Sequence, residues 1–195
     1  MKDGLAIVLG TDNNSYSVAR SYYERYGEKI VACGSAVLVP FKHSKIAKVY
    51  TKDGFYQDND VFVNLLNEVY KKEAKVGDKV IFFVPTEGYL FHLYQNLDKL
   101  DFEYVLPYPE QNLAEQVANK SRFYPLMEDI GISVPKTVSV NPENYQTVLS
   151  EFDANRKLFL KADDYYVFQT SDVEDPQKGY HAANVQEAQD ILNKV

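Results

Sequence analysis

The sequence of 195 residues predicts an α/β protein, with an open, mainly parallel sheet in its first part and a smaller α+β arrangement in its second. Two observations support this prediction. Short, wholly apolar segments alternate with longer segments in which apolar residues recur every three or four positions, the pattern of buried strands and amphipathic helices. The apolar segments also lack the polar alternation of a half-solvated sheet, so helices are expected to cover both faces.

The first strand is expected at residues 5–9, a continuous apolar run that ends at Gly10. A helix follows, because apolar and aromatic side chains recur at helical spacing over residues 18–26, and Gly27 is suited to end it. The apolar run at residues 30–33 comes directly afterwards. These three segments predict a strand–helix–strand unit.

The same pattern continues along the chain. Residues 58–60 are suited to begin a helix, and the apolar run at residues 80–84 predicts the next buried strand. Thr86 is expected to cap a third helix, and residues 104–106 to form a further strand. We therefore expect three helices to cover the two faces of the first sheet.

A Pro-Tyr-Pro segment at residues 107–109 interrupts this pattern. We place a domain boundary there, which gives domains 1–109 and 110–195. In the second domain the periodicity predicts helices at residues 113–118, 123–130, 145–152 and 185–195, and strands at residues 136–140, 158–160 and 180–183.

The composition excludes several classes of protein. The net charge is −7 and no run of five basic residues occurs, which argues against a nucleic-acid partner. Cys33 is the single cysteine, so a disulfide framework is excluded and a reducing compartment is favoured. No segment approaches the roughly 18 apolar residues of a membrane span, and the first ten residues do not resemble a signal peptide. We expect a cytoplasmic protein.

The turn at residues 10–15 is the first candidate site. It joins the carboxyl end of a strand to the start of a helix, where open α/β sheets bind anionic ligands. A dinucleotide site is disfavoured, because only the first glycine of its fingerprint is present and the second strand ends in no acidic residue. Two interpretations stay open: Asn14 and Ser15 cap the helix, or the turn binds a small anionic substrate.

Glu87 is a second candidate, again between a strand and a helix. A carboxylate at a helix N-terminus is favoured by the helix dipole, so Glu87 could be structural; the alternative is that it holds an amine or a hydroxyl. No metal site is expected, because the histidines have no partners at metal-ligand spacing. Neither a nucleophile elbow nor a P-loop occurs.

The most specific pattern lies in the second domain. Asn119-Lys120 is followed by Phe123 and then by Gly-Ile-Ser-Val-Pro-Lys-Thr at residues 131–137, and a later apolar segment runs into Lys161. These residues resemble the start of an ATP-grasp domain. The resemblance implies that Lys120 and Lys161 contact the nucleotide phosphates, a task suited to the compact, three-donor charge of lysine.

The first domain shares this resemblance. Residues 8–13, 19–21 and 26–27 resemble the domain that precedes ATP-grasp lobes. Residues 85–89 match a segment of carboxylate–amine ligases of the D-aspartate ligase type that usually reads Asp-Gly-Tyr, with Glu87 as the departure. The resemblance implies a substrate site at Gly10, Asn13, Asn14, Ser15, Arg20 and Glu87.

The resemblance implies a pre-ATP-grasp, Rossmann-like domain at residues 1–109 and an incomplete ATP-grasp N-terminal lobe at residues 110–195. The usual glycine-rich loop after the second lysine is missing, and Lys178 is the implied third phosphate contact. The implied cofactors are ATP and Mg²⁺, and the implied substrates are a small carboxylate and an amine, such as amino acids or a cell-wall precursor. Homodimer formation stays open.

The implied reaction is phosphorylation of the carboxylate by ATP, followed by attack of the amine to form an amide. The sequence stops before the adenine-contacting hinge and the lobe that supplies the Mg²⁺ ligands in this superfamily. The 195-residue chain alone is therefore expected to be inactive. The alternative is a non-catalytic module that binds a nucleotide or another small ligand.

Overall fold

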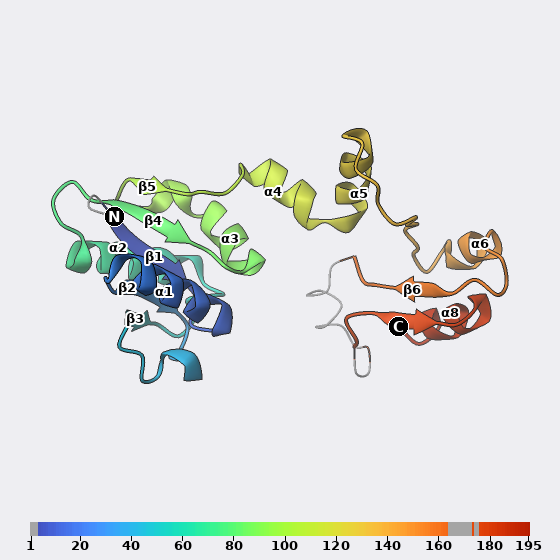
Figure 1. The fold of residues 1–195 in the computed structure, drawn as a ribbon, viewed down its shortest axis with the longest axis horizontal. Helices are drawn as coiled ribbons and strands as arrows, with labels where there is room; N and C mark the ends of the chain where they lie inside the picture. Colours follow the sequence, from blue (N-terminus) through green and yellow to red (C-terminus); the bar gives the residue numbers. More distant parts are fainter. Residues whose placement is uncertain (1–3, 164–172, 174–175) are drawn as a thin grey trace. The chain divides into compact units, whose positions relative to one another are not determined.

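The computed structural model describes residues 4–163, 173 and 176–195, and the chain forms two compact units, Met1–Gln111 and Asn112–Val195 (Figure 1). The division falls at the start of helix α4 (Gln111–Ala118), shortly after the Pro-Tyr-Pro segment. None of the helices in the described ranges is long and apolar enough to cross a membrane.

The first unit contains a five-stranded sheet that is parallel throughout, in the order β3-β2-β1-β4-β5. The predicted α/β class with a mainly parallel sheet is confirmed. Its strands are β1 (Gly4–Leu9), β2 (Ile30–Gly34), β3 (Ala47–Thr51), β4 (Lys79–Phe83) and β5 (Tyr104–Val105). Its helices are α1 (Asn13–Tyr26), α2 (Asn59–Glu73) and α3 (Glu87–Tyr94), with single 3₁₀ turns at Val39–Phe41 and Leu97–Lys99.

Successive residues of β1 belong to two separate cores. Ala6 and Val8 pack in the core under α1, whereas Ile7 and Leu9 pack in the core under α2 and α3. All four are at most 5% exposed. Covering both faces of the sheet explains why this strand is apolar at every position.

Strand β3 was not predicted from the sequence. It lies at one edge of the sheet, and its residues are only partly apolar: Ala47 is buried while Lys48 is exposed. Its polar side chains are held by the end of α2, because the Tyr50 hydroxyl donates to the Glu73 carboxylate at 2.5 Å and Lys48 pairs with the same carboxylate. Because polar residues interrupt its sequence, this edge strand has no continuous apolar run by which it could be identified.

The second unit contains a two-stranded antiparallel sheet of β6 (Leu158–Leu160) and β7 (Tyr180–Ala182). Helices α6 (Tyr145–Ser150) and α8 (Val185–Leu192) pack on it around Leu149, Ala182 and Ala188. Helix α5 (Lys120–Asp129) precedes them. The predicted strand at residues 136–140 is wrong: this segment has no regular secondary structure, and it follows Pro135, which has no N–H to donate to a ladder.

Candidate functional site

In the first unit, the parallel pairing of β1 with β4 brings the turns that follow these strands to one edge of the sheet. The two turns meet: a Cβ built on Gly10 would lie 3.2 Å from the ring of Tyr89. The prediction that residues 10–15 and 86–89 open onto the same edge is confirmed. This edge is where open α/β sheets place their ligands.

Gly10 has a backbone conformation that suits only glycine well. Its φ is 96°, and its N–H donates to the carbonyl of Cys33 at 2.7 Å, which fixes the turn to β2. A Cβ at this position would also lie 2.6 Å from the Ser15 hydroxyl oxygen. The glycine lets helix α1 begin directly behind the strand end.

The start of α1 is capped by Asp12, whose carboxylate accepts from the N–H of Ser15 at 2.9 Å. The interpretation that Asn14 and Ser15 cap the helix is wrong. Ser15 is buried instead, with its hydroxyl 3.0 Å from the Leu9 carbonyl and 2.9 Å from the Asp12 carboxylate. The helix N-terminus therefore carries a carboxylate of its own, in the position that an anionic ligand would favour.

The remaining predicted substrate residues lie in different settings. Asn13 and Asn14 are exposed in the first turn of α1, and Glu87 is exposed as the first residue of α3. Thr86 occupies the N-cap position of α3, but its side chain makes no capping hydrogen bond. Arg20 lies farther along α1 and pairs with Glu24 of the same helix at 2.7 Å.

Side chains that the sequence did not single out also line this edge. The Tyr56 ring lies 5.0 Å from the Tyr89 ring, and a Cβ on Gly88 would collide with the Tyr56 hydroxyl. Ser35 accepts from the Tyr56 N–H at 3.2 Å. Burial raises the pKa of the Tyr89 hydroxyl, against the opposing effect of its hydrogen bond with Ser35. Tyr56 was missed because it follows β3, the strand without a sequence signal.

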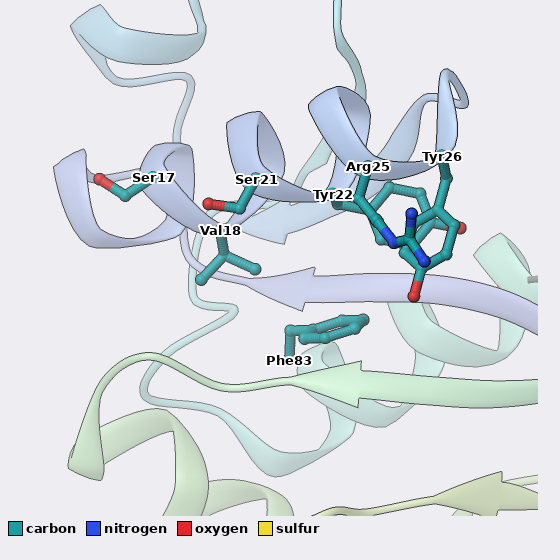
Figure 2. A pocket seen from close by; sticks show the side chains of 7 residues that line it. All are labelled: Ser17, Val18, Ser21, Tyr22, Arg25, Tyr26 and Phe83. Carbon is teal, nitrogen blue, oxygen red and sulfur yellow. The ribbon is translucent and has the colours of Figure 1, made fainter.

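A shallow hollow adjoins the start of α1 and includes Asp12 and Asn13. Its other side is the exposed apolar segment around Val39, which is 85% exposed. A second hollow lies between α1 and β4, where Val18 and Tyr22 face Phe83 (Figure 2). None of the predicted site residues lines this second hollow.

The histidines and the cysteine show no arrangement for metal binding. Among the described residues, no group of three or more His, Cys, Asp or Glu side chains could hold a metal ion. Cys33 is fully buried, and burial raises the pKa of its thiol. His92 packs edge-on against Phe62 with ring centroids 4.4 Å apart, and burial lowers the pKa of its imidazole, with Lys99 acting in the same direction and Asp58 opposing it.

In the second unit, Lys120 is the first residue of α5 and is half-buried. Its ammonium group donates to the backbone carbonyl of Asp163 at 2.9 Å. Lys161 is exposed and directly follows β6, two positions before Asp163. The two predicted phosphate-binding lysines therefore lie on segments that are distant in sequence and joined by a hydrogen bond. Lys178 is exposed and precedes β7, the strand paired with β6.

Comparison with known proteins gives sequence and structural relatives, although no family model matches the chain. It is 32% identical over 139 residues to a D-aspartate ligase of Enterococcus faecium strain Aus0004, which covers 71% of this chain and 33% of that protein. The chain thus spans about a third of the length of this curated relative.

Two solved structures share the fold over the whole length. An L-amino acid ligase from Bacillus licheniformis has a TM-score of 0.61 at 12% identity, covering 100% of this chain and 43% of that one. An N5-carboxyaminoimidazole ribonucleotide synthetase, solved as its ADP complex, has a TM-score of 0.65 at 19% identity, covering 99% of this chain and 45% of that one.

Proposed function

We propose that this chain, which belongs by sequence and fold with the N-terminal portions of ATP-grasp ligases, is the front part of an ATP-dependent carboxylate–amine ligase. In this reaction ATP supplies a phosphoryl group to a carboxylate, and an amine then displaces phosphate to form an amide. The single observation that carries the proposal is the hydrogen bond that holds Lys120 beside the segment bearing Lys161.

The described residues fit the phosphate part of a nucleotide. Lys120 and Lys161 supply positive charge from two elements. An ammonium group has three donors, of which Lys120 uses one on the Asp163 carbonyl and keeps two for phosphate oxygens. Such residues act by holding and neutralising phosphate charge, because positioning and electrostatics supply most of the catalysis in phosphoryl transfer. Lys178, before β7, is proposed as a further contact. The described residues do not fit a Mg²⁺ site, so none is assigned.

The edge of the first sheet is proposed as the substrate site. Gly10, Asn13, Asn14, Ser15 and Glu87 are the residues assigned to it. The carboxylates of Asp12 and Glu87 lie at the starts of α1 and α3, so this edge favours the ammonium group of an amino acid over a second anion. Arg20 contributes only if it leaves its exposed pair with Glu24.

The nucleotide assignment predicts that Lys120→Ala and Lys161→Ala each weaken MgATP binding about fivefold, since an exposed charge contact contributes up to about 1 kcal/mol. The measurement is the initial slope of amide shift against nucleotide concentration, by NMR on the 195-residue chain. Lys194→Ala removes the same charge from the exposed end of the same unit and is the control. Equal slopes for all three variants would contradict the assignment.

The second candidate function is a non-catalytic module that binds a small ligand. The cluster of Tyr56, Ser35 and Tyr89 at the edge of the first sheet favours this second candidate, because the cluster forms without any contribution from Lys120 or Lys161. A ligand that shifts the amide signals of residues 10–15 equally in the wild type and in Lys120→Ala, with no response to nucleotide in either, would support this alternative.

A further inference from the structure

Asp163 makes three hydrogen bonds to three consecutive residues at the start of α5. Its carboxylate accepts from the side-chain amide of Asn119 at 3.2 Å and from the backbone N–H of Ser121 at 3.3 Å. Its backbone carbonyl accepts from the Lys120 ammonium at 2.9 Å. These contacts join residues 42 to 44 positions apart in the sequence.

The orientation of the Asn119 side chain is fixed by hydrogen bonds to both its amide oxygen and its amide nitrogen. Its amide oxygen accepts from the N–H of Arg122 at 3.2 Å and from the hydroxyl of Ser121 at 2.6 Å, as the N-cap of α5. Its amide nitrogen is therefore left to face Asp163. The first turn of α5 and the segment after β6 form one connected hydrogen-bond network, in which Asp163 is the shared member.

The charge of Asp163 has the wrong sign for a phosphate site. A carboxylate on the residue that binds Lys120 repels a nucleotide phosphate, so its charge alone would weaken binding. Its hydrogen bonds have the opposite consequence, because they keep the Lys120 segment next to the segment that carries Lys161. Because the charge of Asp163 weakens nucleotide binding, Asp163 can strengthen binding only by positioning the two lysine-bearing segments.

We propose that Asp163 is a positioning residue, which holds the start of α5 against the end of β6 so that Lys120 and Lys161 act on the same phosphate group. The proposal rests on the proposed function, which takes the two lysines as phosphate ligands. Asp163 itself touches Lys120 through its backbone and the helix start through its carboxylate; it contacts no nucleotide.

Two substitutions of Asp163 remove the same negative charge but keep different hydrogen bonds. Comparing them distinguishes the effect of its hydrogen bonds on nucleotide binding from the effect of its charge. Asp163→Ala loses both carboxylate acceptors, whereas Asp163→Asn keeps one acceptor oxygen for the Ser121 N–H. The 195-residue chain is titrated with MgATP by NMR, and the initial shift slopes are compared. We expect Asp163→Ala to bind about fivefold more weakly than Asp163→Asn, comparable to the loss of one exposed charge contact. Equal binding by the two variants, or tighter binding by Asp163→Ala, overturns the proposal.

A second readout needs no nucleotide. The amide exchange rate and ¹⁵N shift of Ser121 should change strongly in Asp163→Ala and less in Asp163→Asn, while the signals of α8 stay in place. An unchanged Ser121 amide overturns the network itself. If Ser121 responds as expected but Lys120→Ala and Lys161→Ala leave nucleotide binding unaltered, the proposed function fails and the role of Asp163 fails with it, while the hydrogen bonds stand.

Discussion

Replacing Gly10 with alanine is expected to lower the free energy of unfolding of residues 1–111 by on the order of 3 kcal/mol. Two costs add. An L-residue at a φ of 96° is strained by about 1–2 kcal/mol. The new Cβ would also lie 2.6 Å from the Ser15 hydroxyl oxygen and 3.2 Å from the Tyr89 ring, so the buried hydrogen bond from Ser15 to Leu9 must shift.

The chain offers a matched control in Gly27→Ala. Gly27 has a φ of 70° at the end of α1, and a Cβ built there meets no atom within 4 Å. It should cost only the conformational strain, roughly 1 kcal/mol. Urea unfolding followed through the amide signals of β1 and β4 compares the two variants. Equal destabilisation would show that Gly10 is not constrained by Ser15 and Tyr89.

Phe62→Ala is expected to destabilise the same unit by about 3–5 kcal/mol, because it leaves a cavity in the core under α2 and α3. The Phe62 side chain is fully buried, 4.8 Å from the Phe55 ring and 4.4 Å from the His92 ring, measured between centroids. It therefore supports α3, whose first residues lie at the sheet edge that we propose as the substrate site.

The same urea measurement tests this prediction, with Val39→Ala as the control at a position that is 85% exposed. The control should change stability by less than about 0.5 kcal/mol. A loss below about 1 kcal/mol for Phe62→Ala would mean that the core closes around the missing ring, and that α3 does not depend on it.

The strands of the first sheet were predictable where they present a continuous apolar or aromatic run, which holds even for the exposed edge strand β5. β1 and β4 lie inside the sheet and present continuous apolar runs, whereas β3 lies at its edge and keeps polar side chains such as Lys48. Residues 136–140 show the opposite error, because Val138 and Val140 alternate with polar residues as in a strand but no ladder forms among the described residues.

Candidate site residues could be named from the sequence only where a local pattern singles them out. Lys120 and Lys161 were named by resemblance in short segments, and Gly10 by its place between strand and helix; their roles stay predictions. Asp163 carries no such signal, since its contact with Lys120 joins residues of α5 and the segment after β6 that are 43 positions apart in the sequence. The cap of α1 was misplaced within one turn, because Asp12, Asn14 and Ser15 are all good capping residues and only the backbone decides among them.

We propose that residues 1–195 hold the phosphate-side lysines of a ligase but not a complete nucleotide site. Two exposed charge contacts contribute about 1 kcal/mol each, against several kcal/mol for immobilising a ligand. We therefore expect the chain to bind MgATP with a dissociation constant in the millimolar range or weaker, on the order of −4 kcal/mol. The proteins that it matches are more than twice as long, and we propose that the groups completing the site lie in the parts it does not match.

Calorimetry of the purified 195-residue chain with MgATP, run beside an assay of ADP release, tests this proposal. We expect no resolvable heat at micromolar nucleotide and no steady ADP production. Micromolar binding or sustained turnover would contradict it, and would place a complete nucleotide site within these 195 residues.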